Sequence, residues 1–166
     1  MQAPAGHKRQ STELTIQTYI NAPIERCFDL ARSIDFHQDS VSYTQEKAVS
    51  GVTTGLIGLD QEVVWLARHF GLWFSMRVRI AALSRPDYFR DEMVQGPFRH
   101  FQHDHTFTQE GSSTIMFDNL RFESPFSLLG RTFDKLVLQA HLLSFLENRN
   151  RTLKSVAESD QWHKYL

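Results

Sequence analysis

The order of hydrophobic and polar positions predicts a strand followed by two short helices at the start of the fold. Apolar and polar residues alternate from Thr12 to Ile20, which is the period of a strand with one buried face. Pro23 then suits a first helical position, because its missing N–H costs nothing there. Apolar residues recur at helical spacing at Ile24, Cys27, Phe28 and Ala31. A second helix is predicted over 35–41, with Ser33 or Asp35 as its cap.

The central part of the chain, from about Tyr43 to Ser124, has strand patterns and turn signals but no convincing helical period. Gly71 and Arg85-Pro86-Asp87 mark turns. The last two strands are joined by a tight hairpin whose loop is Glu110-Gly111 or Gly111-Ser112. The pattern therefore predicts an antiparallel meander with strands over 42–49, 61–70, 72–84, 88–95, 98–109 and 112–123.

One long helix, over about 127–158, follows the meander. The interval from Leu136 to Leu146 is apolar nearly all round, and His141 within it is predicted to be a core or interface residue. A helix with so wide an apolar surface needs cover on more than one side, so we expect a concave sheet to wrap around it. The predicted stripe consists of Leu129, Phe133, Leu136, Val137, Ala140 and Leu143.

Length and composition are those of one globular domain in an α+β arrangement. The 166 residues divide into a flexible arm over 1–11, a domain over 12–158 and a tail over 159–166. A net charge of −1 leaves no excess of Lys and Arg for phosphates, so we predict no nucleic-acid partner. No run of 18 apolar residues occurs, so no membrane span is expected. The single cysteine, Cys27, fits a reducing environment, and we expect a cytoplasmic location.

Several short motifs stand out along the chain: Ile20-Asn21-Ala22-Pro23-Ile24-Glu25, Val63-x-Trp65-x-Ala67-x-His69-Phe70-Gly71, Phe89-x-Asp91-x-Met93, His103-Asp104-His105-x-Phe107 and Met116-x-Asp118. Together with the order of the elements, they resemble the SRPBCC superfamily, the START-like proteins related in fold to the major birch-pollen allergen. The resemblance covers residues 12–158, and the motifs look like those of one bacterial branch of ligand-binding proteins. It implies a helix-grip fold, in which about seven curved antiparallel strands hold a long C-terminal helix around a hydrophobic cavity, and it implies no particular reaction.

Candidate polar chemistry lies on the last two predicted strands. Alternate residues of a strand share a face, so His103 and His105 point the same way as their phenylalanine neighbours, which suggests the inward face. A loop at Glu110-Gly111 would place His103 opposite Asp118, whereas a loop at Gly111-Ser112 would place His105 there. In either register an inward carboxylate lies beside an inward histidine.

These patterns predict a cavity that binds a small hydrophobic molecule, such as a lipid, an isoprenoid or a polyketide-like compound. The alternatives are a cyclase or hydrolase that uses the His/Asp cluster, and a purely structural hydrogen-bonded network. A His-x-His pair also suggests zinc, but the signal is weak, and no cofactor or metal is predicted. A homodimer through Leu138, Leu142 and Phe145 is a further alternative. The predicted cavity residues are Trp65, His69, Phe89, Asp91, Met93, Phe101, His103, His105, Met116, Asp118, Phe133 and Val137.

Overall fold

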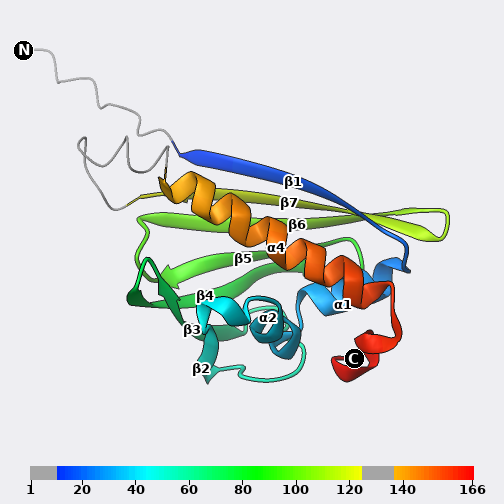
Figure 1. The fold of residues 1–166 in the computed structure, drawn as a ribbon, viewed down its shortest axis with the longest axis horizontal. Coiled ribbons are helices and arrows are strands. Elements are labelled where there is room, and N and C mark those ends of the chain that lie inside the picture. Colours follow the sequence, from blue (N-terminus) through cyan, green and yellow to red (C-terminus); the bar gives the residue numbers. More distant parts are fainter. Residues whose placement is uncertain (1–10, 125–136) are drawn as a thin grey trace, which may run out of the picture.

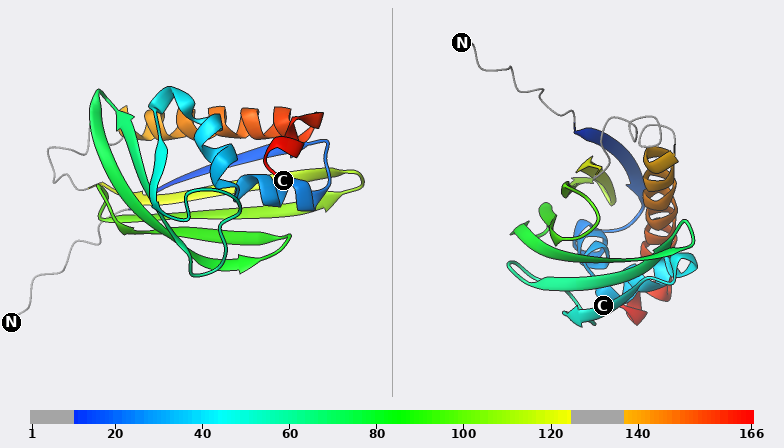
Figure 2. Two further views of the ribbon diagram at one scale, coloured as in Figure 1. Left: turned by 90° about the horizontal axis from the view of Figure 1, so that it is seen from below. Right: turned by 90° about the vertical axis from the view of Figure 1, so that its left-hand side faces the viewer.

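A seven-stranded antiparallel sheet curves around the C-terminal helix (Figures 1 and 2). The computed structural model describes residues 11–124 and 137–166, so the predicted arm lies almost entirely outside the described residues. The strands are ordered β1-β7-β6-β5-β4-β3-β2. In the right-hand view of Figure 2 they form an arc, with helix α4 at its open side. This arrangement confirms the predicted helix-grip architecture.

The elements follow the predicted order along the chain. Helices α1 and α2 come between the first two strands, and the remaining strands form a meander before α4. The bounds are β1 Thr12–Ile20, α1 Ile24–Ala31, α2 Ile34–Ser40, the 3-10 turn η1 Ser42–Thr44, β2 Lys47–Gly51, β3 Glu62–His69, β4 Leu72–Ser84, β5 Tyr88–Gln95, β6 His100–Glu110, β7 Ser113–Glu123, α4 Gln139–Ala157 and the 3-10 turn η4 Asp160–Lys164.

The strand predicted over 42–49 is wrong at its start, because β2 begins only at Lys47. Local hydrogen bonds hold Ser42–Thr44 in a 3-10 turn: the Thr44 hydroxyl donates to the Val41 carbonyl at 2.7 Å. Gln45 then adopts a left-handed conformation with φ 55°, which is incompatible with an extended strand. The chain straightens only beyond this residue.

Of the predicted helix caps, the one at Ser33 is confirmed, and Asp35 and Pro23 have other positions than predicted. The Ser33 hydroxyl accepts a hydrogen bond from the Phe36 N–H at 3.3 Å, so Ser33 caps α2. Asp35 instead accepts from the Gly55 N–H at 2.7 Å and thereby ties α2 to the loop before β3. Pro23 takes the N-cap position of α1 rather than its first turn.

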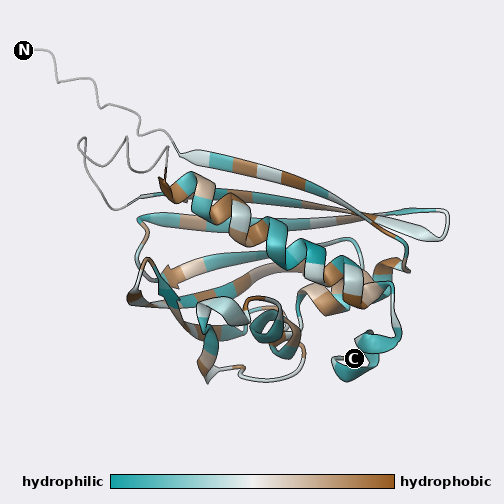
Figure 3. Ribbon diagram, in the orientation of Figure 1, coloured by the Kyte–Doolittle hydropathy of each residue, from teal (hydrophilic) through white to brown (hydrophobic). Residues whose placement is uncertain are grey.

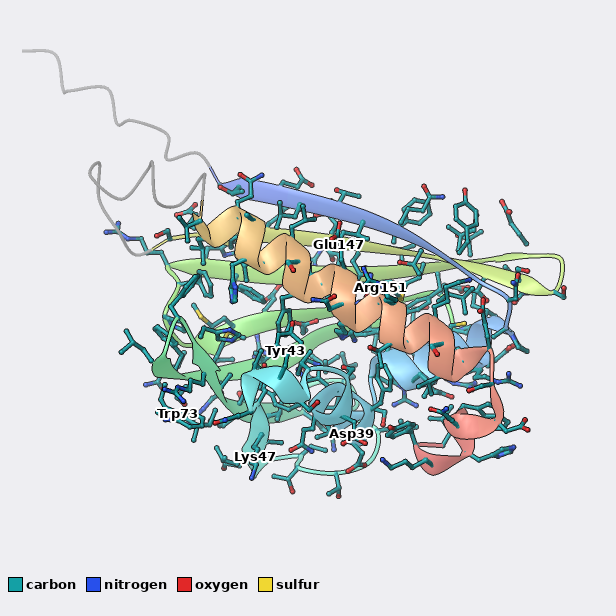
Figure 4. All side chains as sticks on the ribbon, in the orientation of Figure 1. Asp39, Tyr43, Lys47, Trp73, Glu147 and Arg151 are labelled. Atoms are coloured by element: carbon teal, nitrogen blue, oxygen red, sulfur yellow. The ribbon has the colours of Figure 1, made fainter. Side chains whose placement is uncertain are left out.

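The buried face of α4 differs from the predicted stripe. Val137 is 40% exposed and Ala140 is exposed, whereas Leu129, Phe133 and Leu136 lie outside the described residues. Apolar residues gather in the first turns of α4 and polar residues follow (Figure 3). Charged side chains such as Glu147 and Arg151 lie on its outer side (Figure 4). The buried face consists of Leu138, Leu146, Arg149, Asn150, Leu153, Val156 and Ala157.

The C-terminal residues, predicted as a tail, are packed against the domain. The Tyr165 ring contacts Phe36 edge to face at 5.5 Å between centroids, and its hydroxyl donates to Asp39 at 3.0 Å. The Arg26 guanidinium lies over Trp162 at 4.5 Å. Within the ranges 11–124 and 137–166, no helix has the length and apolar character needed to cross a bilayer.

Candidate functional site

A cavity of about 360 Å³ lies between the concave side of the sheet and α4. Its walls are mainly apolar side chains of β3 to β6 and of α4, and residues around the start of α2 line it as well. At the turn between β3 and β4, Phe70 and Leu72 line the cavity and are 51% and 64% exposed. The cavity therefore reaches the surface beside this turn.

Most of the predicted cavity residues line this space, namely Trp65, His69, Phe89, Asp91, Phe101, His103 and His105. Met116 and Asp118 are fully buried but do not belong to the lining. Met93 is only partly buried and lies outside it. Val137 is placed on the exposed side of its helix, and Phe133 lies outside the described residues. The three side chains proposed for a dimer contact, Leu138, Leu142 and Phe145, instead line the cavity of their own chain.

The hairpin register brings the two histidines and the buried aspartate together. Glu110 pairs with Ser113, so the loop is Gly111-Ser112, and His105 lies opposite Asp118. Asp118 Oδ1 lies 2.9 Å from His103 Nε2 and 2.8 Å from His105 Nδ1. None of these three atoms has a partner at good hydrogen-bonding angles, so their attraction is chiefly electrostatic.

Asp91 on β5 contacts the same histidines from the cavity side. Its Oδ1 lies 3.0 Å from His105 Nε2 and 4.0 Å from His103 Nδ1. The side chain of Asp91 is 17% exposed, whereas that of Asp118 is completely buried. The His105 ring also stacks on Phe89 at 4.1 Å between centroids. The two adjacent imidazoles are thus flanked by two carboxylates: Asp118 lies behind the cavity wall, and Asp91 lies on the cavity side.

The pKa shifts of Asp118, His103 and His105 show which of the two histidines is protonated first. Burial alone would raise the pKa of Asp118, but His103 and His105 hold that pKa well below its usual range. Burial lowers the pKa of His103, as does the neighbouring charge on His105. Burial would also lower the pKa of His105, but Asp118 and Asp91 outweigh it and raise the value. His105 is therefore protonated before His103, and His103 remains the neutral ring that faces the cavity.

Two residues of α4 complete the polar end of the cavity, and neither was predicted from the sequence. Asn150 donates to Asp118 Oδ2 at 2.6 Å. Arg149 lines the cavity, donates to the Ala31 carbonyl at 2.7 Å and lies 4.0 Å from Asp118 Oδ1. A signal was present: the two polar residues continue the spacing of the buried face between Leu146 and Leu153.

A second polar contact, also missed, lies between α2 and the start of β2. His37 Nε2 lies 2.9 Å from Glu46 Oε1, and both residues line the cavity. The His37 ring packs against Trp65 at 4.3 Å between centroids. Neither residue stands in a periodic pattern that would have indicated an inward side chain.

A histidine pair joins β3 to α4 near the opening of the cavity. His141 Nε2 and His69 Nδ1 lie 3.0 Å apart, a distance that requires at least one neutral ring. Phe145 packs on His69 and Phe70 on His141. Burial lowers the pKa of both histidines; Glu46 partly opposes this at His69, and His69 lowers the pKa of His141 further.

We expect this pair to weaken the fold in mild acid. A folded pKa below the unfolded value of about 6.5 means that the unfolded chain takes up protons first, so stability is lost as the pH falls below that value. Between pH 7.5 and 5.5 the Tm of the wild type should fall by roughly 2–4 °C more than that of the His69→Gln/His141→Gln variant. Thermal melts by circular dichroism measure the difference, and parallel curves for the two proteins would contradict it.

Solved structures share this architecture, although no protein-family model and no curated protein sequence matches the chain. The TTHA0849 protein of Thermus thermophilus matches with a TM-score of 0.69 at 20% identity, over 88% of this chain and 99% of its own. The major latex-like protein 151 of Panax ginseng matches at 0.67 and 15%, over 90% and 99%. The Zhui aromatase/cyclase of Streptomyces sp. R1128 matches at 0.73 and 12%, over 90% and 94%.

Identities at this level show a shared fold. Each match covers most of both chains, so the likeness extends over the sheet, the short helices and the C-terminal helix together. The fold that the resemblance implied is confirmed: the chain has the helix-grip fold of these structures.

Proposed function

We propose that the protein binds and carries a small hydrophobic molecule, of the lipid, isoprenoid or polyketide-like class, in its internal cavity. The observation that carries this proposal is the cavity of about 360 Å³, which is open beside the β3–β4 turn and lined mainly by apolar side chains. Ligand pockets in proteins span roughly 300–1,000 Å³, so this cavity suits a compact ligand. An unfilled apolar space of this size is costly to maintain in a packed core without such a use.

The polar side chains at the inner end of the cavity indicate which chemical group the bound ligand carries there. Asp91, His103 and Arg149 line an otherwise apolar wall, so a ligand that buries only hydrocarbon there would leave part of their hydrogen-bonding capacity unused. His103 Nε2 lies 2.9 Å from Asp118 Oδ1, but the carboxylate oxygen nearest to its Nδ1 is 4.0 Å away. We therefore expect an apolar body with one oxygen-bearing group directed at His103 Nδ1 and Arg149.

Similar structures support this class of function. Both the latex-like protein of ginseng and the Zhui aromatase/cyclase share the fold over nearly their full lengths. A fold that encloses a hollow between sheet and helix can serve either binding or turnover of an apolar compound. The choice between these two rests on the site itself.

Filling the cavity should abolish binding without unfolding the protein. Ala67 on β3 is buried and lines the cavity, so the ring in Ala67→Phe occupies the space that a ligand needs. We expect the affinity for the naphthalene dye 1-anilinonaphthalene-8-sulfonate, measured by fluorescence titration, to fall at least about tenfold. Native mass spectrometry of protein taken from cells should show a bound small molecule in the wild type and none in the variant.

The control for this test is Ser75→Phe, which adds the same ring at an exposed position of β4. Its circular dichroism spectrum and dye affinity should match those of the wild type. Equal dye affinity in Ala67→Phe and the wild type, with both proteins folded, would refute the proposal.

A cyclase or hydrolase that uses the same cavity is the second candidate function. It is favoured by one observation: Asp91, His103 and His105 line the open cavity rather than being sealed behind phenylalanines. A neutral histidine between two carboxylates is suited to moving a proton. The test measures the rate of deuterium exchange at the α-carbon of a β-diketone in the presence of the protein. If the wild type exchanges deuterium no faster than His103→Gln, the enzyme interpretation is wrong.

A further inference from the structure

The ring nitrogens of His103 and His105 are arranged in two matched pairs. One nitrogen of each ring, Nε2 of His103 and Nδ1 of His105, lies within 3 Å of Asp118 Oδ1 behind the cavity wall. The other nitrogen of each ring faces Asp91 Oδ1, at 4.0 Å for His103 and 3.0 Å for His105. Both rings are thus fixed from behind and present their remaining nitrogens at one point of the cavity.

We propose that Asp91, His103 and His105 form a binding site for one divalent transition-metal ion at the inner end of the cavity. Their ligand atoms all lie within 4.8 Å of one another. With metal–ligand bonds of about 2.0–2.2 Å, neighbouring atoms of a tetrahedral site are about 3.4 Å apart. The separations of the two histidine nitrogens from Asp91 Oδ1, 3.0 and 4.0 Å, lie on either side of this value, and no pair of ligand atoms is more than 4.8 Å apart.

Asp118 stands where the outer partner of a metal-bound histidine is usually found. A metal-bound histidine usually donates its other ring N–H to a carboxylate, which fixes the ring and makes its free nitrogen a better ligand. Here one fully buried carboxylate lies within 3 Å of a nitrogen of each ring, and Asn150 donates to that carboxylate in turn at 2.6 Å. A second carboxylate, Asp91, stands on the cavity side and makes a hydrogen bond with His105 Nε2 at 3.0 Å.

The donor set indicates the kind of ion. Two imidazole nitrogens and one carboxylate oxygen favour zinc, iron, copper or nickel over magnesium and calcium, which prefer oxygen ligands. All three residues line the cavity, so the remaining coordination positions face the hollow, as in sites where the ion contacts a ligand.

The charge balance predicts what the open position binds, a step that rests on the proposed ligand-binding function. With both rings neutral, the carboxylates of Asp91 and Asp118 and the guanidinium of Arg149 sum to one negative charge. A divalent ion changes this to one positive charge. With the ion bound, His103 Nδ1 is a metal ligand, so the oxygen-bearing group of the cavity ligand would bind the ion in its place; an anionic oxygen, such as a carboxylate or an enolate, suits this open position.

The test is a calorimetric titration. The full chain is first stripped of metal with EDTA, and Zn²⁺ is then added while the heat of binding is measured. We expect one equivalent to bind with micromolar or tighter affinity, and Co²⁺ in its place should give the visible absorption bands of a four- or five-coordinate ion. Asp91→Asn and His103→Gln should each weaken Zn²⁺ binding by at least about tenfold. Asp91→Asn keeps the size of the side chain and lies at the cavity surface, so it should remain folded, which circular dichroism verifies.

The matched control is the other histidine pair of the same cavity. His69→Gln/His141→Gln removes two close imidazoles at the opening and should leave Zn²⁺ affinity unchanged. Loss of binding in this variant, or equal affinity in Asp91→Asn and the wild type, would overturn the proposed site. Absence of Zn²⁺ and Co²⁺ binding in a wild type that still binds the naphthalene dye would overturn the metal site alone and leave the proposed function standing.

Discussion

Replacing Asp118 by alanine should lower the free energy of unfolding by about 3–5 kcal/mol, because it removes one partner from a buried group of charges. The carboxylate is fully buried and is contacted by His103, His105 and Asn150. Without it, Arg149 also loses the nearest negative charge that the structure shows for it, at 4.0 Å. Urea denaturation followed by circular dichroism, in the presence of EDTA, measures the loss.

Two further variants locate the origin of this effect. Asp118→Asn keeps the shape and removes the charge, so we expect an intermediate loss. Asp39→Ala removes an exposed carboxylate paired with Lys164, whose contribution should be below about 1 kcal/mol. If Asp118→Ala unfolded at the same urea concentration as Asp39→Ala, the cluster would carry no stability, and its role would be purely functional.

Replacing Phe28 by alanine should cost a similar amount, about 3–5 kcal/mol, for a different reason. Phe28 lies on α1 and is fully buried. Its ring contacts Phe89 at 5.5 Å and Phe107 at 5.4 Å between centroids, both edge to face. Truncation opens a hole between α1 and the sheet, and it also frees Phe89, on which His105 stacks. Dye affinity should therefore fall together with stability, as measured by denaturation and titration.

Conservative and exposed substitutions give the comparison for Phe28. Phe28→Leu fills much of the same space and should cost less than half as much as the alanine variant. Tyr19→Ala, at a side chain that is 60% exposed on β1, should change stability by less than about 0.5 kcal/mol. Equal losses in all three variants would contradict the packing argument.

Local signals were sufficient to predict the bounds of β4 and β5 but not the register of the last hairpin. β4 and β5 have the predicted bounds because turn residues flank both, and the middle of β4 also alternates apolar and polar positions. The hairpin loop left two registers open, since Glu110-Gly111 and Gly111-Ser112 are both suitable turn pairs. Only the pairing of Glu110 with Ser113 decides that His105, rather than His103, lies opposite Asp118.

The cavity and its polar end could be predicted only in part. Inward rows of aromatic residues have the same pattern whether they fill a core or surround a hollow, so the alternation around Trp65 and Phe89 could not predict the volume. Periodicity also gave the wrong phase for α4, because its wide apolar start obscures which side faces the sheet; Val137 and Ala140 proved exposed. Distances between elements far apart in the chain, such as the 2.6 Å from Asn150 to Asp118, leave no local pattern.

The position of Arg149 and Asn150 on one turn of α4 links the width of the hollow to its chemistry. The helix that bounds the cavity is also the helix that anchors Asp118 and, through the Ala31 carbonyl, the end of α1. An outward displacement of α4 to admit a bulkier molecule would therefore reposition the buried carboxylate and the imidazoles that it orients. The size of molecule that the cavity admits and its selectivity for polar groups are therefore coupled through α4, and a change in one alters the other.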